Sequence, residues 1–248
     1  MRKKPLIIIF LIFTLSIFVF YFIKDKSIQN KGILSLAFDD GYLTQYTLAY
    51  PEMQKYSFNG TLYLIVNLTE FESKELMTFE QAEEMQEHGW EIGSHGLNHK
   101  SLTILSKEKV EKELSLSKDI LENKGFKIYT FAFPFGYYNE EILNKTKKYY
   151  FASRPMVWGY NDRNNTDFYT LKSKWVKKGN SPQEICSWVE YAHKNNLWLT
   201  LVFHYIGNSE ERPFDESIND FKEILNCVNE TNIKVKTIKE VLEDEKRI

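Results

Sequence analysis

The sequence predicts an α/β protein in which helices cover a largely parallel sheet. Segments typical of strands and of helices alternate roughly seven times along the chain, as β/α units do. The strand segments are apolar on both faces, which is typical of parallel strands buried between helices. A closed β/α barrel and an open, doubly wound sheet both fit this pattern.

The composition is that of an ordinary globular protein. The 248 residues suit about one domain, with 43% hydrophobic and 27% charged residues. The formal net charge is −2, and the lysines are scattered along the chain. A basic patch or tail is the usual signature of a nucleic-acid partner. We therefore expect no nucleic-acid partner.

The N-terminus differs from the rest of the chain. A basic tip, Arg2–Lys4, precedes an uncharged apolar segment, 6–23, which is close to the ~20 residues that a membrane-spanning helix needs. No small-residue cleavage site follows, so we predict an uncleaved signal-anchor over residues 1–26 and one folded domain over 27–248. The basic tip predicts a single-pass protein with this domain outside the cytoplasm. Cleavage would instead make it a secreted protein.

Local signals give the order of the elements. Thr78 with Gln81 forms a capping box, Ser106 and Asn139 are typical N-caps, and Pro51 should kink or restart a helix over 44–56. We expect a loop over the site at 155–170. The expected strands are 33–41, 60–66, 90–94, 127–133, 150–153, 171–176, 197–204 and 233–238. The other expected helices are 78–88, 106–124, 139–148, one opened by Ser181, Pro182 and Glu184, one with an apolar stripe of Phe221, Ile224, Leu225 and Val228, and a short one at the end.

Residues able to do chemistry follow three of these strands. Asp39 and Asp40 end the first, His95 and His99 follow the third, and His204 follows the most apolar one. In either layout, ligands collect at the carboxyl ends of the strands. One carboxylate and two histidines form a common ligand set for Zn²⁺ and similar ions. The plainer alternatives are an ordinary Asp-Gly turn, two surface histidines and a structural histidine.

Four motifs, in order, resemble those of the polysaccharide deacetylases, the NodB-homology group or carbohydrate esterase family 4. They are 37–41 (Ala-Phe-Asp-Asp-Gly), 94–99 (Ser-His-Gly-Leu-Asn-His), 131–136 (Phe-Ala-Phe-Pro-Phe-Gly) and 201–204 (Leu-Val-Phe-His). The resemblance covers about residues 32 to 242. It implies a distorted, incomplete (β/α)7-type barrel that removes N-acetyl groups from N-acetylglucosamine-type units of a polysaccharide at the cell surface or outside the cell.

The resemblance also implies a role for each matching residue. Asp40, His95 and His99 correspond to a metal triad, Asp39 to the catalytic base and His204 to the catalytic acid. The implied cofactor is one divalent ion, with Zn²⁺ first and Co²⁺ or Ni²⁺ as alternatives. The implied partner is an N-acetylated polysaccharide.

The chain departs from the family pattern at two points. Ala132 stands where many members have an arginine that orients the base, and Arg154 is the candidate substitute. The segment that supports the catalytic histidine is not clear, and Trp175 and Asp162 are candidates for it. We expect the backbone N–H of Phe135 to bind the oxyanion. The candidates for a surface on which sugars stack are Tyr42, Phe135, Tyr137 and Trp158.

Two alternatives to an N-deacetylase remain. One is a carbohydrate-binding relative that keeps the metal and lacks turnover, suggested by Ala132. The other is an O-acetyl esterase or small-molecule amidase on the same scaffold. The two cysteines, Cys186 and Cys227, fit either one bridge or two buried thiols. His88 and His193 lie near expected helix ends and are interpreted as surface residues.

Overall fold

The structure is a computed structural model that describes residues 32–67, 75–207 and 214–248. The predicted signal-anchor over residues 1–26 lies outside these ranges, and the domain boundary at residue 27 stays a prediction. Among the residues described, no helix combines the length and apolar character needed to cross a membrane.

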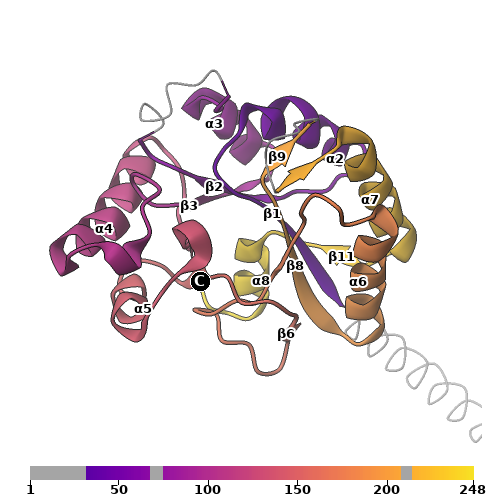
Figure 1. The fold of residues 1–248 in the computed structure, drawn as a ribbon. Coiled ribbons are helices and arrows are strands. Elements are labelled where there is room, and N and C mark those ends of the chain that lie inside the picture. Colours follow the sequence, from indigo (N-terminus) through magenta and orange to yellow (C-terminus); the bar gives the residue numbers. More distant parts are fainter. Residues whose placement is uncertain (1–31, 68–74, 208–213) are drawn as a thin grey trace, which may run out of the picture. The chain divides into compact units, whose positions relative to one another are not determined.

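A curled, mostly parallel sheet forms the centre of the described chain (Figure 1). Its strands run in the order β5–β4–β3–β2–β1–β8–β6, and the short strands β11 and β7 pair with β1 and β8. The pairs are parallel except β6 with β8. The strands are β1 (Ile33–Phe38), β2 (Thr61–Leu64), β3 (Glu91–Ser94), β4 (Thr130–Ala132), β5 (Ala152–Arg154), β6 (Asn161–Asp162), β7 (Lys174–Trp175), β8 (Leu197–Phe203) and β11 (Lys234–Val235).

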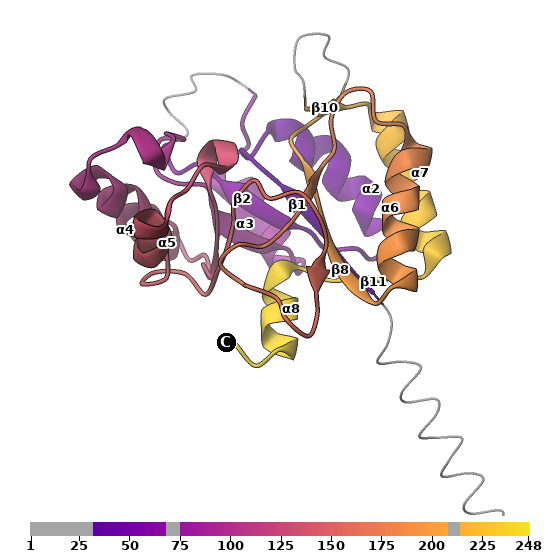
Figure 2. The same cartoon turned by 60° about the horizontal axis from the view of Figure 1, so that its bottom comes forward.

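Helices cover the outer face of this sheet, with α6 and α7 side by side at one end and α4 and α5 at the other (Figure 2). They are α2 (Tyr50–Gln54), α3 (Phe79–Glu87), α4 (Lys107–Asn123), α5 (Glu140–Thr146), α6 (Pro182–Lys194) and α7 (Ile218–Thr231). Short helical turns, η1 (Gln45–Ala49), η3 (Leu102–Ile104) and η4 (Pro134–Gly136), and a small pair of strands, β9 (Tyr205–Ile206) with β10 (Asp215–Glu216), lie between them. The order of elements confirms the predicted α/β fold, in the form of an open half-barrel.

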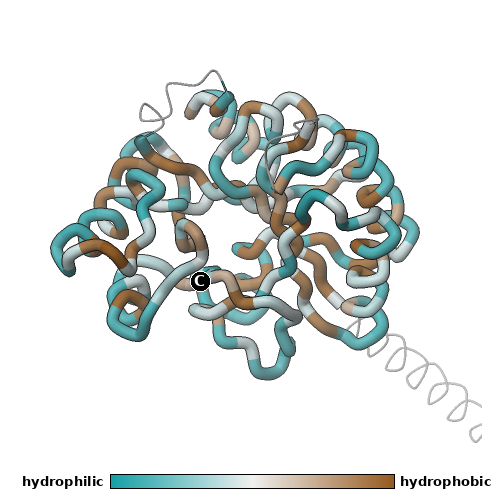
Figure 3. The backbone as a smooth tube through the Cα atoms, viewed as in Figure 1, coloured by the Kyte–Doolittle hydropathy of each residue, from teal (hydrophilic) through white to brown (hydrophobic). Residues whose placement is uncertain are grey.

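Alternate residues of the central strands β1, β2 and β8 belong to two separate cores. Leu34, Leu36 and Phe38 of β1 pack outward under the helices, whereas Ile33 and Ala37 pack inward. This alternation is the ordinary consequence of the two-residue period of a strand. Figure 3 shows apolar residues along the central strands and a mixture of polar and apolar residues along the surrounding helices.

The short helix α8 (Ile238–Asp244) closes the inner core. Its buried side chains Ile238, Val241 and Leu242 pack with the inward residues of the strands. Glu91 holds the start of this helix, because its carboxylate accepts a hydrogen bond from the Lys239 backbone N–H at 2.7 Å. The carboxylate also accepts the hydroxyls of residues on β2 and β4, at 2.8 and 2.6 Å. A strand-borne carboxylate thus joins two neighbouring strands to the last helix.

Most local signals in the sequence have the structural outcome they predict. Thr78 and Gln81 form the capping box of α3, and Ser106, Asn139 and Ser181 accept N-cap hydrogen bonds. Pro51 restarts the predicted helix, because it stands in the first turn of α2 directly after the π-helical turn η1.

Several predicted segments differ, among them the strands expected at 33–41, 171–176 and 233–238, which are limited to β1, β7 and β11. The strand expected at 127–133 is limited to Thr130–Ala132. The loop expected over the site at 155–170 reaches the candidate site at Met156, but it then contains β6, which pairs antiparallel with the start of β8 and so leads away from the carboxyl ends of the strands.

Cys186 of α6 and Cys227 of α7 form a disulfide, which resolves the two alternatives left by the sequence. Their Cα atoms are 6.0 Å apart, within the usual range for a bridge. The two helices also share an apolar interface, since Ile185 and Val189 of α6 and Ile224 and Val228 of α7 belong to the outer core. The bridge therefore links covalently two helices that already pack together.

Replacing both cysteines by serine should lower the stability of the domain. The bridge closes a loop of 41 residues, for which loop-closure entropy predicts a contribution of about 4 kcal/mol. We expect this loss in urea unfolding of the full chain in mild detergent, followed by tryptophan fluorescence. Reductant should destabilise the wild type to a similar extent and leave the C186S/C227S variant unchanged. Equal stability of the variant and the oxidised wild type would contradict the bridge.

Candidate active site

Nine residues predicted from the sequence to form the site line one cavity at the carboxyl ends of the strands. This cavity has a volume of about 320 Å³, near the lower limit for ligand pockets. The lining residues are Asp39, Asp40, His95, His99, Phe133, Phe135, Gly136, Tyr137, Arg154, Met156, Trp175, His204 and Phe214. Tyr42 and Trp158, the other two aromatic residues considered for sugar stacking, are not among them.

A tight turn after β1 separates the two aspartates. Asp39 still belongs to the ladder, since its N–H donates to the Phe203 carbonyl at 3.0 Å. Asp40 and Gly41 then take left-handed backbone conformations, with φ of 75° and 77°. A short polar side chain is one of the few that tolerate this conformation. The turn sends one carboxylate to His204 and Arg154 and the other to the two histidines of the loop after β3.

Asp40 faces His95 and His99 at the wall of the cavity. Its Oδ1 lies 3.4 Å from His95 Nε2 and 3.3 Å from His99 Nε2. His95 Nδ1 is hydrogen-bonded at 2.9 Å to the Ala132 carbonyl, which orients Nε2 toward the aspartate. His99 has a left-handed backbone, with φ of 49°. Three potential donor atoms therefore face one another within 4.8 Å.

This arrangement fits a divalent cation. Asp40 Oδ1 is buried and has no hydrogen-bond partner within the described part of the chain, which is costly for a carboxylate oxygen unless another group neutralises it. With metal–ligand bonds of 2.0–2.2 Å in a tetrahedron, neighbouring donor atoms are about 3.4 Å apart. The two separations between Asp40 and the imidazoles match that edge. One carboxylate and two imidazoles also leave positions open for water and substrate.

The protonation of the three groups agrees with this fit. Burial alone would raise the pKa of Asp40, but the imidazoles outweigh burial and hold the pKa well below its usual range. Burial opposes a charge on His95 as well, yet Asp40 and Asp39 raise its pKa. Burial and the neighbouring His95 lower the pKa of His99 to about 4. His99 is therefore neutral near pH 7, which is the form in which an imidazole binds a metal ion.

Asp39 is paired with Arg154. The guanidinium Nη2 lies 2.5 and 2.7 Å from the two carboxylate oxygens, and both side chains are buried. Burial raises the pKa of Asp39, but Arg154 and the imidazoles of His95 and His204 together lower it below its usual value. Arg154 also makes a cation–π contact with Tyr63, whose ring centre is 5.2 Å from the guanidinium carbon. Arg154 thus makes the contact with Asp39 that was predicted for it in place of an arginine at position 132.

His204 lines the same cavity, beside Asp39. Its Nε2 is 3.8 Å from Asp39 Oδ2, and its ring stacks on Phe214 with centroids 5.0 Å apart. Nδ1 has no hydrogen-bond partner among the described residues. The prediction that Asp162 supports His204 is wrong. Asp162 pairs with Leu197 at the start of β8, about 20 Å of strand away from its end.

Gln45 is a positioning residue that the sequence analysis missed. Its side chain is fully buried, and Nε2 donates to the backbone carbonyls of Asp39 at 2.6 Å and His204 at 2.7 Å. It therefore ties the ends of β1 and β8 together. Gln45 opens the π-helical turn η1, a type of turn that is frequent at functional sites.

Glu113 is the second missed positioning residue. Its Oε2 accepts the N–H groups of Leu97 and Asn98 at 2.8 and 3.1 Å, and its Oε1 accepts the Asn98 amide at 2.7 Å. It thereby fixes the loop between the two histidines. The available signal was a carboxylate within the apolar stripe of α4, beside Val110 and Leu114, where a charge needs buried partners.

Comparison with known proteins identifies the family. A sequence profile described as polysaccharide deacetylase matches residues 26–152, just over half of the chain. The chain therefore belongs to the polysaccharide deacetylase family, a family of enzymes. Arg154, Trp175 and His204 lie beyond the matched range.

Individual relatives agree with this assignment. The Bacillus subtilis protein YxkH is 35% identical over 126 residues, which are 50% of this chain and 44% of the relative. A Staphylococcus epidermidis poly-beta-1,6-N-acetyl-D-glucosamine N-deacetylase is 31% identical over 148 residues, 54% and 50% of the two chains. The chain spans about half the length of these relatives. A structure of the Streptococcus pyogenes deacetylase PplD with acetate has a TM-score of 0.57 at 28% identity, covering 62% of this chain and 69% of PplD.

Removing the Glu113 carboxylate should weaken metal binding without unfolding the domain. In Glu113→Ala the loop between the two histidines loses three hydrogen bonds, so the imidazoles are held less well. Loss of such supporting groups typically costs 10–100-fold in metal affinity, and we expect a rise of about that size in the dissociation constant for Co²⁺. The measurement is a Co²⁺ titration followed by visible absorption.

The matched control is Glu111→Ala on the same helix. Glu111 pairs with Lys145 on α5 and not with the histidine loop, so its loss should leave Co²⁺ affinity unchanged. Equal affinities for both variants would contradict the positioning role of Glu113.

Proposed function

We propose that this protein is a metal-dependent hydrolase that removes N-acetyl groups from N-acetylglucosamine-type units of a cell-surface or extracellular polysaccharide. The observation that carries the proposal is the arrangement around one cavity. A carboxylate held ionised by Arg154, a histidine 3.8 Å from it, and three donor groups suited to a cation all face the same space. An acetamide is a poor electrophile, so its hydrolysis needs all three kinds of group.

Asp40, His95 and His99 would hold the ion, which supplies a Lewis acid that polarises the acetyl carbonyl and lowers the pKa of a bound water. Zn²⁺ suits two imidazoles and a carboxylate best, and Co²⁺ and Ni²⁺ are compatible with the same set. The backbone N–H of Phe135 is our candidate for a further donor to the carbonyl oxygen. Phe135 has a left-handed backbone, unusual for a bulky residue, and its ring lies 4.6 Å from that of His99.

Asp39 and His204 would transfer the protons. Asp39 accepts a proton from the attacking water as the new C–O bond forms. His204, in its protonated form, gives a proton to the nitrogen as the C–N bond breaks, so that the sugar leaves as an amine and acetate remains. Both groups line the same cavity, with His204 Nε2 3.8 Å from Asp39 Oδ2, which supports roles for both in one reaction.

The cavity wall suits an acetylated sugar. Phe133, Met156 and Phe214 offer apolar surface for the acetyl methyl group, and exposed rings at the mouth offer faces for the sugar. Tyr137 and Trp175 are our candidates for sugar stacking. The S. epidermidis relative is named for poly-β-1,6-N-acetylglucosamine, which supports a polymer of N-acetylglucosamine as the substrate class.

We also propose that the protein acts outside the cytoplasm, anchored by its N-terminal apolar segment. Two observations support this location. The segment 6–23 is long and uncharged, and the domain carries the Cys186–Cys227 disulfide, which persists in oxidising compartments.

A carbohydrate-binding protein without turnover is the second candidate. The observation that favours it is the Nδ1 of His204, which has no hydrogen-bond partner among the described residues. A catalytic acid is usually oriented through this second nitrogen.

Acetate release distinguishes the two candidates. The full chain with Zn²⁺ or Co²⁺ should release acetate from fragments of chitin, peptidoglycan or poly-N-acetylglucosamine, and chelation should stop the release. Asp39→Asn and His204→Ala should each lower kcat by about 10²–10⁴-fold, the usual contribution of a general base or acid. Both variants should keep the metal. If no substrate yields acetate and both variants bind oligosaccharide as tightly as wild type, the binding protein is the better interpretation.

Arg154→Met should move the acid limb of the activity profile to higher pH. Without the guanidinium, burial becomes the dominant influence and raises the pKa of Asp39. A smaller fraction of the base is then ionised near pH 7, so activity falls there and recovers as the pH rises. The measurement is kcat/KM against pH, with Arg154→Lys as a control that keeps a positive charge. An unchanged acid limb in Arg154→Met would show that Asp39 is not the base.

A further inference from the structure

Aromatic side chains continue outward from the cavity along one side of the domain. Trp175 lines the cavity, and its ring centre lies 5.1 Å from that of Trp158. Trp158 in turn lies 5.4 Å from Trp188 of α6, and Tyr160 lies 5.0 Å from Tyr191 of the same helix. We call Trp175, Trp158, Trp188, Tyr160 and Tyr191 the aromatic strip.

Lys174 lies between the rings of the strip and contacts three of them. Its ammonium nitrogen lies 5.0 Å from the ring centre of Trp158, 4.6 Å from that of Tyr160 and 4.4 Å from that of Trp188. These distances are typical of cation–π contacts. The side chain is only 7% exposed, so the surface of the strip consists of rings and not of charge.

The backbone under Trp158 is also fixed. Ser173 donates its N–H to the Val157 carbonyl at 2.8 Å, and its own carbonyl accepts the Gly159 N–H at 3.2 Å. Trp188 and Tyr191 stand three residues apart on α6, which puts them on the same side of the helix. The rings are therefore held in place before any ligand arrives, which lowers the entropy cost of binding.

The strip nevertheless leaves much ring surface open to solvent. Trp158 is 47% exposed and Tyr191 is 52% exposed, although Trp188 between them is buried. Single exposed rings need no explanation, but a series of held rings that starts in a ligand cavity does. The cavity itself, at about 320 Å³, is small for a polymer, so most of a long substrate has to lie outside it.

We propose that the aromatic strip binds the part of the polysaccharide that extends beyond the unit being deacetylated, through sugar rings stacked on Trp158 and Tyr191. This proposal rests on the proposed function for the class of ligand. A β-linked N-acetylglucosamine chain suits the strip because each pyranose ring has a face of C–H groups and no charge. Rigid, amphipathic Trp and Tyr side chains provide such contact area at low entropy cost.

The test compares binding of short and long oligosaccharides. The full chain carrying Asp39→Asn, which slows turnover, is titrated calorimetrically with dimers and hexamers of β-1,4- and of β-1,6-linked N-acetylglucosamine. In at least one series the hexamer should bind about tenfold more tightly than the dimer. Trp158→Ala and Tyr191→Ala should each reduce that ratio about threefold to tenfold, as expected for one lost aromatic contact. Trp158→Phe should restore part of it.

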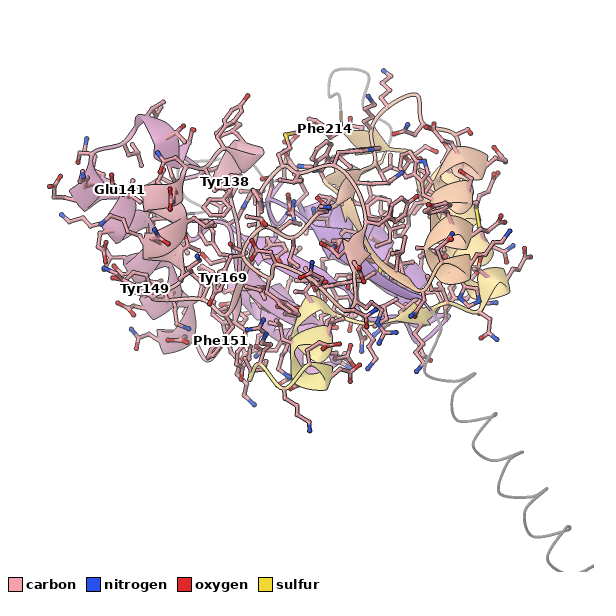
Figure 4. The ribbon with its side chains drawn as sticks, turned by 90° about the horizontal axis from the view of Figure 1, so that it is seen from below. Tyr138, Glu141, Tyr149, Phe151, Tyr169 and Phe214 are labelled. Carbon is pink, nitrogen blue, oxygen red and sulfur yellow. A yellow bond between two sulfur atoms is a disulfide. The ribbon has the colours of Figure 1, made fainter. Side chains whose placement is uncertain are left out.

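The matched control is Phe151→Ala. Phe151 is 47% exposed, as Trp158 is, and lies apart from Phe214 at the cavity (Figure 4). Its loss should leave the hexamer-to-dimer ratio unchanged. Thermal unfolding checks that each variant is folded, and Tyr191→Ala puts a strong helix former at an exposed helix position, so it should fold.

Several outcomes would overturn the proposal. The first is a hexamer that binds no more tightly than the dimer in both series. The second is a fall of the hexamer-to-dimer ratio in Phe151→Ala equal to that in Trp158→Ala. The third is a change in the self-association of Trp158→Ala, which would mark the strip as a protein interface. The result is independent of turnover. Acetate release without a chain-length effect rejects the strip alone, and a chain-length effect without acetate release rejects only the hydrolase.

Discussion

The pairing of β1 with β8 is the constraint on which the site depends. The two strands pair in parallel register over six residues, from Ile33 with Trp198 to Phe38 with Phe203. Asp39 and His204 follow the last pair, so the register itself makes the two proposed proton-transfer groups neighbours. A slip of one residue would turn every side chain to the opposite face and separate them. Gln45 secures this end of the pair by donating to both backbone carbonyls.

The pairing of β4 with β5 explains how Asp39, the proposed base, has an arginine beside it. Ala132 and Arg154 are directly opposite each other in the register of these parallel strands. Their side chains therefore point to the same face of the sheet, so a guanidinium on β5 enters the same layer of the half-barrel as one on β4 would. Ala132 keeps a separate role, because its backbone carbonyl orients His95 whatever its side chain is. Moving the arginine to the adjacent strand thus leaves the imidazole undisturbed.

The sequence predicted the parts of the site that depend on residue type at strand ends. Asp40, His95 and His99 could be grouped because parallel strands end at one edge of a sheet, and capping residues gave the helix limits. Gln45 and Glu113 could not be found in this way. Their roles depend on backbone groups distant in sequence, as with His204, 159 residues from Gln45. Asp162 was misassigned because nothing local predicts that β6 runs antiparallel at the start of β8.

The aromatic residues fall into two groups, one buried behind the strand ends and one exposed at the mouth of the cavity. Phe38, Phe203 and Phe221 are buried and in mutual contact behind the strand ends, where they hold β1 and β8 against α7. Around the mouth, by contrast, Phe135 and Tyr137 are 52% and 62% exposed. Leaving apolar rings in water lowers stability, so rings gathered at the mouth of a cavity indicate binding of a ligand with apolar faces. A sugar polymer has such faces on every unit, whereas a small soluble amide could cover only the rings nearest the reacting bond. The exposed rings therefore support the proposed polymer substrate over a small-molecule amide.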